Sequence, residues 1–130
     1  MNRENLSSMA DYIETIPQEK FDMNTYRRGE SVKHACGSVG CILGHCTIID
    51  ERPLPVDYYA DIAFASWSLE FTGLNPNSDE WDYLFSSFWT YGDNTPTGAA
   101  KRIRHFLEKG LPQDWHEQMH GRAPLSYMTD

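Results

Sequence analysis

The sequence predicts an all-α fold, a single compact domain of five or six short helices, and three observations lead to this prediction. Apolar residues recur at spacings of three and four along several segments, as on the buried face of a helix. Capping residues, prolines and glycines stand at the borders of those segments. No clean alternating run of Val, Ile and aromatic residues predicts a strand. The 130 residues suffice for one hydrophobic core, which four Trp, seven Tyr and six Phe side chains would fill.

The first predicted helix stops at Pro17, because proline cannot continue the hydrogen-bond ladder. Its apolar face comprises Leu6, Met9, Ala10, Ile13 and Ile16. Residues 18–35 are polar and rich in turn formers. A second helix is expected to begin near Ser38, whose hydroxyl suits the free amides of a first turn, and to run to about Ile49. The Arg52-Pro53-Leu54-Pro55 stretch then breaks it.

The third predicted helix spans Asp57 to Thr72, and Gly73 ends it. Its expected buried face comprises Ala60, Ala63, Phe64, Trp67 and Phe71. Asn77 or Ser78 caps a short fourth helix. The apolar residues of this fourth helix are Trp81, Leu84, Phe85 and, by extension, Phe88.

The fifth predicted helix has the strongest signals, because Thr95 is a capping residue and Pro96 follows at the first helical position. Gly110 stands where a C-terminal glycine belongs. The apolar face comprises Ala99, Ile103, Phe106 and Leu107. A basic stretch on the same helix is expected to be a solvated face: Lys101, Arg102, Arg104 and His105. Residues 112–119 add one or two turns around Trp115, and residues 118–130 are expected to form a loose tail.

The negative charge is concentrated in the middle of the chain. The net charge is −8, and residues 50–94 account for all of it, with nine acidic residues against Arg52 alone. Such a surface repels phosphate backbones, so direct nucleic-acid binding is not expected. It would attract a basic surface of another protein, although a solvated, solubilising face is the simpler alternative. The candidate partner-binding residues are Asp57, Asp61, Asp79, Glu80 and Asp82.

The chain shows no run of about 18 apolar residues, so no membrane span is expected. Its first residues lack the apolar core and cleavage site of a secretory signal. A cytoplasmic location with reduced thiols follows as an expectation. The three cysteines are an odd number, which argues against a disulfide framework.

All three cysteines and two of the five histidines lie within residues 34–46. On a helix, Cys41 and His45 project to the same side, so they could hold one metal ion with Cys36 and His34 as further ligands. Zinc accepts this mixed set. The spacing lacks the short Cys-x2-Cys chelate, however, and the other histidine pair four residues apart is His116 and His120. A zinc site built from Cys36, Cys41 and His45 therefore remains an alternative, with no cofactor as the first expectation.

The same cluster also permits a thiol nucleophile. Cys36-Gly-Ser superficially matches the start of the papain-like protease motif, but Val39-Gly40 follows where those enzymes have Cys-Trp. Their partner histidine would also lie beyond this chain. A base such as His105 or His116 remains open. A Cys36–Cys41 disulfide would require a non-helical turn, because five helical residues rise about 7.5 Å.

The preferred interpretation of the cluster is structural. Gly40 and Gly44 share a helix face and allow another helix to approach closely, and Cys41 is a small, easily buried side chain. Gly37 suits a tight entry turn. In this interpretation residues 34–46 form a tightly packed helix start.

Several motifs together resemble a family of small uncharacterised proteins of bacteriophages and bacteria. These motifs are Phe21-Asp22-Met23-x-x-Tyr26 and Cys36-Gly37-Ser38-x-Gly40-Cys41-x-x-Gly44-His45. The similarity continues in Thr72-Gly73-Leu74, in Leu84-Phe85 with Trp89, and in residues 95–103, and covers roughly residues 6–111. The resemblance implies a helical fold and a phage accessory protein, and it brings no established activity. The place of His45 is often aromatic in that family, which favours the structural interpretation.

The function expected from these observations is that of a non-enzymatic, phage-type accessory protein in the bacterial host cytoplasm. It would bind a host protein with a basic surface and inhibit a defence or nucleic-acid-handling complex, in the manner of an anti-CRISPR protein. The acidic residues would occupy a basic groove meant for DNA or RNA. The alternatives are a zinc-binding module and a small thiol enzyme.

Overall fold

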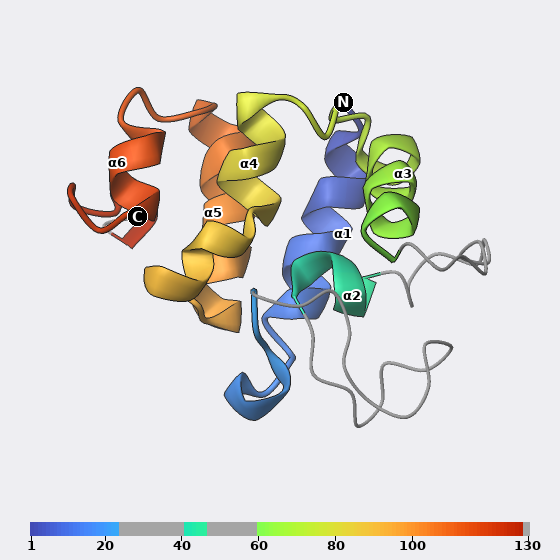
Figure 1. Cartoon of the computed structure of the whole chain (residues 1–130), viewed down its shortest axis with the longest axis horizontal. Coiled ribbons are helices and arrows are strands. Elements are labelled where there is room, and N and C mark those ends of the chain that lie inside the picture. The colour runs from blue at the N-terminus through green and yellow to red at the C-terminus, as the bar shows by residue number, and fades with distance from the viewer. Residues whose placement is uncertain (24–40, 47–59, 129–130) are drawn as a thin grey trace.

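The computed structural model describes residues 1–23, 41–46 and 60–128; for Gly44 and residues 60–63 it describes the backbone alone. This part of the chain is helical and contains no sheet, which confirms the predicted all-α fold (Figure 1). The α-helices are α1 (Arg3–Ile13), α2 (Ile42–Cys46), α3 (Ala60–Thr72), α4 (Asp79–Phe85), α5 (Pro96–Lys109) and α6 (Trp115–Met119). Three 3-10 turns accompany them: η1 (Gln18–Lys20), η3 (Ser87–Tyr91) and η4 (Ser126–Met128). No helix in the described ranges is long and apolar enough to cross a bilayer.

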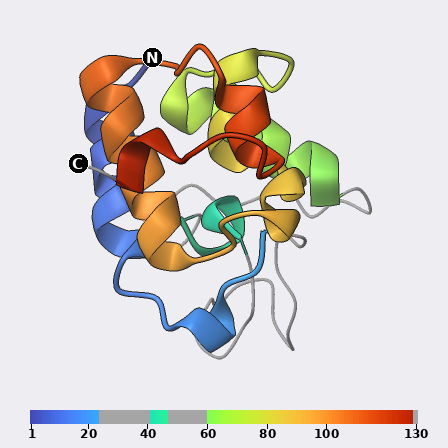
Figure 2. The ribbon, with the colours of Figure 1, turned by 90° about the vertical axis from the view of Figure 1, so that its left-hand side faces the viewer.

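Helices α1 and α5 pack against each other along their length, and Figure 2 shows them side by side at the left edge of the view. Their apolar stripes meet there, with Leu6, Met9 and Ile13 facing Ala99 and Ile103 in one buried cluster. Helices α2 and α3 cover α1 on one side. Helices α4 and α6 contact each other, and α6 lies at the opposite end of the molecule from α3 (Figure 1).

The helix borders follow the local signals. The side chains of Asn2, Ser78 and Thr95 each accept a hydrogen bond from a first-turn amide, of α1, α4 and α5 respectively. Gly73 ends α3 with a φ of +75°, and a Cβ there would lie 3.0 Å from Met1 Cα. Glycine thus provides both the left-handed turn and the room for the N-terminus to pass, where Asn2 N donates to Thr72 O.

Two borders differ from the sequence expectation. Helix α1 ends at Ile13, and a tighter turn carries the chain to Ile16, which is half-buried. Phe88 does not extend α4, because Ser86 is in extended conformation and its hydroxyl accepts a hydrogen bond from Phe88 N, starting η3. The predicted start of the second helix at Ser38 lies outside the described residues.

Residues 118–128 are packed on the body of the molecule, which corrects the expected loose tail. Gln118 and Tyr127 are fully buried and Met119 nearly so. The Gln118 side-chain amide donates to Ser126 Oγ at 2.6 Å and accepts from Ser126 N, so α6 and η4 hold each other in place. The sequence prediction failed here because the anchoring residues are isolated along the chain and show no helical periodicity.

Candidate functional site

The first turn of α4 carries three of the predicted partner-binding residues. Asp79 is exposed, and Glu80 and Asp82 are half-buried. Acidic side chains are favourable at this position because the free amides of a helix N-terminus carry partial positive charge. Burial raises the pKa of Asp82, the neighbouring Asp79 raises it further, and His116 opposes the rise. Asp82 therefore lies within electrostatic reach of both a carboxylate and an imidazole.

Helix α6 places two histidines beside this acidic turn. The rings of His116 and His120 are 4.5 Å apart between centroids, and the His120 ring lies 5.3 Å from that of Phe88 in η3. Trp115 meets His116 edge-on at 5.3 Å. Helix α6 therefore connects α4 to η3, through His116 near Asp82 on one side and His120 against Phe88 on the other.

The 3-10 turn η3 presents two large aromatic side chains to solvent. Phe88 is 52% and Tyr91 82% exposed, whereas most aromatic side chains of the described residues lie in the core. They are three residues apart, and in a 3-10 helix this spacing puts both on the same side. The chain then passes close to α6, since a Cβ on Gly92 would lie 2.8 Å from Met119 O.

We call the combined surface the α4–α6 face. It comprises Asp79, Glu80, Asp82, Phe88, Tyr91, His116 and His120. It joins carboxylates, imidazoles and exposed aromatic rings on neighbouring helical elements. Figure 2 views the molecule from this end, with α6 in front and η3 beside it.

The other predicted acidic residues lie apart from this face or outside the described chain. Asp61 belongs to the first turn of α3, about two turns before Ser68, whose hydroxyl accepts a hydrogen bond from Trp81 Nε1 of α4. Only the backbone of Asp61 is described, and Asp57 lies outside the described residues. Asp61 and the α4 carboxylates belong to the same acidic stretch of the sequence, but the structure does not place Asp61 on the α4–α6 face.

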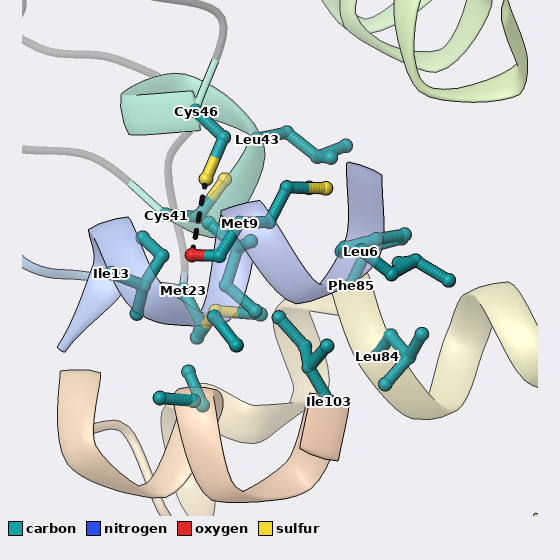
Figure 3. Packing of buried hydrophobic residues seen from close by; sticks show 14 of the residues in the cluster. Leu6, Met9, Ile13, Met23, Cys41, Leu43, Cys46, Leu84, Phe85 and Ile103 are labelled. Atoms are coloured by element: carbon teal, nitrogen blue, oxygen red, sulfur yellow. Dashed lines mark hydrogen bonds between the residues drawn. The ribbon is translucent and has the colours of Figure 1, made fainter. Parts of the chain in front are cut away.

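The described members of the cysteine–histidine cluster are buried in the core (Figure 3). Cys46 Sγ donates to Met9 O at 3.8 Å, and burial raises the pKa of the Cys46 thiol. His45 Nε2 donates to Lys20 O at 2.5 Å. Cys41 is 3% exposed. These surroundings resemble those of packed core residues, as the structural interpretation predicts.

The metal and nucleophile hypotheses for that cluster stay predictions, since His34 and Cys36 lie outside the described residues. Within the described ranges, no three His, Cys, Asp or Glu side chains gather around a point that could hold an ion. The raised pKa of Cys46 disfavours the thiolate that a nucleophile needs.

The expected solvated face of α5 is wrong for two of its four basic residues, because Arg102 and His105 are buried, whereas Lys101 and Arg104 are partly exposed. Arg102 is fully buried and His105 is 8% exposed, while Arg104 bridges to α1. Arg102 Nη1 donates to Tyr127 Oη at 3.0 Å, and its Cζ lies 3.8 Å from the centre of the Trp89 ring. The Tyr127 hydroxyl donates in turn to Asp93 Oδ2. This buried network joins α5 to η3 and to η4, so its role is to hold these segments together.

A periodicity signal for Arg102 was present in the sequence. Arg102 is three residues after Ala99 and four before Phe106, so it falls on the apolar side of the helix rather than opposite it. At this position the helical register, and not the charge of the residue type, indicates the burial that the structure shows.

No known protein-family model, curated protein or solved structure matches this chain.

Proposed function

We propose that this protein binds a partner protein with a basic surface through its α4–α6 face. The observation that carries the proposal is that α6 connects an acidic helix turn to an exposed aromatic ring. Asp82 of α4 is within electrostatic reach of His116, and the His120 ring contacts Phe88 of η3. Binding energy at protein interfaces is concentrated in a few aromatic and charged anchors, with polar groups around them. In this proposal Phe88 and Tyr91 are the anchors, and Asp79, Glu80 and Asp82 attract the partner.

The charge distribution supports a basic partner rather than a nucleic acid. The net charge is −8, and the α4 turn holds three carboxylates close together. Of the basic residues in α5, Arg102 is buried in a network and Arg104 is paired with Asp11 and Glu14. Electrostatic attraction between complementary surfaces speeds association and makes it sensitive to salt.

The finer version of the proposal is a phage-type accessory protein in the bacterial cytoplasm that inhibits a host defence or nucleic-acid-handling complex. The carboxylates of the α4–α6 face would then occupy a basic groove that otherwise holds DNA or RNA. Motif resemblance and acidity support this version. It predicts competition between this protein and nucleic acid for the partner.

The test is capture of partners from bacterial lysate by the immobilised full chain at low and high salt. The charge-reversed variant D79K/E80K/D82K and the variant F88A/Y91A are expected to lose a basic partner that the unmodified chain retains at low salt. The matched control is E4K/E19K/E108K, which changes the net charge by the same amount at exposed positions elsewhere. Equal capture by both charge-reversed variants, or capture of no basic protein at either salt concentration, contradicts the proposal.

A further inference from the structure

We propose that His116 and His120 form a two-imidazole chelate for a divalent transition-metal cation such as Ni²⁺, Cu²⁺ or Zn²⁺. The proposal concerns a binding site on α6 and does not depend on the proposed partner. It is also separate from the cysteine–histidine cluster of residues 34–46.

The backbone holds the two histidines one helical turn apart. His120 N donates to His116 O at 3.2 Å, which is the hydrogen bond of an α-helical turn. Side chains four residues apart lie above one another on the same face. His120 is the C-cap of α6 with φ −92° and ψ 9°, so it stays close enough to helical geometry to keep this register.

The two rings are already near the separation that a shared ion requires. Their centroids are 4.5 Å apart and the ring planes are tilted by 56°. Two nitrogens that each bind one ion at about 2.1 Å lie no more than about 4.2 Å from each other. His116 is exposed, so its ring has room to turn toward the ion, whereas His120 is steadied by Phe88.

The ring nitrogens are available within the described part of the chain. Neither imidazole makes a side-chain hydrogen bond to another described residue, in contrast to His45, which donates to Lys20 O. The surrounding charge also favours a cation. Asp82 is within electrostatic reach of His116, and the nearby Arg122 is paired with Glu117 at 2.8 Å.

The ligand set selects the class of metal. Imidazole suits Ni²⁺, Cu²⁺ and Zn²⁺, whereas Mg²⁺ prefers oxygen ligands. Since no third His, Cys, Asp or Glu of the described residues completes an enclosing group, water would take the remaining coordination positions. The site is therefore an open surface chelate rather than a closed structural zinc site.

The experiment is calorimetric titration of the full chain, carrying no histidine tag, with NiCl₂, ZnCl₂ and MgCl₂. We expect one equivalent of Ni²⁺ or Zn²⁺ to bind and Mg²⁺ to give no signal. His116→Gln and His120→Gln are each expected to weaken Ni²⁺ binding by an order of magnitude or more. Glu108→Gln, an exposed carboxylate on α5 that leaves the Arg122–Glu117 pair intact, is the matched control and is expected to bind Ni²⁺ as the unmodified chain does.

His116→Gln alone decides the proposal if His120→Gln disturbs the packing on Phe88. Failure of the unmodified chain to bind Ni²⁺ or Zn²⁺ overturns the proposal, and so does binding that His116→Gln leaves unchanged. Binding that is lost in Cys41→Ser and retained in His116→Gln overturns it too, because the ion then belongs to the cysteine–histidine cluster.

Discussion

The Arg102 guanidinium is held by groups from three different segments of the chain. It stacks on Trp89 of η3, donates to Tyr127 of η4 and points toward the Asp93 carbonyl, which lies 3.4 Å from Nη1. A buried cation is costly unless aromatic faces, hydrogen bonds and nearby negative charge replace its water. Arg102 has aromatic faces, hydrogen bonds through Nη1 and the nearby Asp93 carboxylate, whereas its Nε and Nη2 find no hydrogen-bond partner among the described residues. Through these contacts it links the C-terminal segment to the core.

Replacing Arg102 by Met is expected to lower the free energy of unfolding by about 2–4 kcal/mol, because the Tyr127 hydroxyl loses its donor and the Trp89 face its cation. Urea denaturation followed by Trp fluorescence measures the change. Lys101→Met, at the half-exposed neighbouring position, is the control and is expected to change stability little. A loss from Arg102→Met no larger than that of the control would contradict this account.

Position 98 requires a glycine because the Asp93 carboxylate occupies the space of a side chain, and not because the backbone there is left-handed. A Cβ at position 98 would lie 1.8 Å from Asp93 Oδ2, within the first turn of α5. The Asp93 carboxylate accepts hydrogen bonds from Thr95 Oγ1 and Tyr127 Oη, so moving it away from position 98 would break both. The close approach leaves no room for any side chain.

Gly98→Ala is therefore expected to destabilise the protein by about 1–3 kcal/mol, although alanine is the better helix former. Thermal denaturation of a double-mutant cycle with Asp93→Ala tests the cause. In the Asp93→Ala background, Gly98→Ala is expected to be neutral or stabilising because the clash is gone. An equal penalty in both backgrounds would show that Asp93 is not the reason.

At the scale of the elements, α1 and α5 are joined at the surface as well as through the core. Arg104 of α5 donates to Glu14 Oε2 at 2.7 Å and to Asp11 Oδ1 at 2.9 Å. The Arg104 hydrogen bond is the main reason why the pKa of Glu14 lies below its ordinary value of 4.5. The carboxylate is exposed, so the contribution to stability is small and sensitive to salt.

The lowered pKa of Glu14 sets the direction of a pH effect. A depressed folded-state pKa gives stability that is fully present above the unfolded value, about 4.5, and is lost as pH falls through the folded value. The unmodified chain is therefore expected to melt above Glu14→Gln at neutral pH, and this difference is expected to shrink below pH ~4.5. Melting curves across pH test it, with Glu19→Gln as an exposed control. A pH-independent difference would rule out the Arg104 contact as its source.

At the scale of the whole molecule, the core is assembled from segments distant in the sequence. Cys46 of α2 lies against Met9 of α1, and the same cluster includes Leu84 and Phe85 of α4 and Ile103 of α5 (Figure 3). The thiol of Cys46 is fully buried, and burial raises its pKa. Reagents can therefore reach it only when this part of the core opens.

Alkylation of Cys46 is accordingly expected to be far slower in the native protein than in urea. Peptide mass spectrometry after iodoacetamide treatment, at several times and with the unfolded chain as the reference, measures both rates. Fast native labelling of Cys46 would contradict the packing and would revive the hypothesis of a reactive thiol.

Element borders were the part of the fold that the sequence predicted best. Thr95, Pro96 and Gly110 predicted α5, and the periodic spacing of Leu6, Met9, Ala10 and Ile13 predicted the buried face of α1, because capping and helical periodicity are local properties. The candidate site was predicted in part. Asp79, Glu80 and Asp82 do share one helix turn, but the approach of Asp82 to His116 and of His120 to Phe88 arises from contacts between elements.

The sequence by itself determined that the described chain is helical, where α4 and α5 begin, where α3 and α5 end, and that the charge is concentrated in the middle third. These follow from residue type and spacing within a few positions. Only the tertiary structure decided that Arg102 is buried, that residues 118–128 are packed, and that His116 and His120 lie between the acidic turn of α4 and the exposed Phe88 ring. Those facts depend on which distant segments meet, and the burial of a group depends on its neighbours in space rather than in sequence.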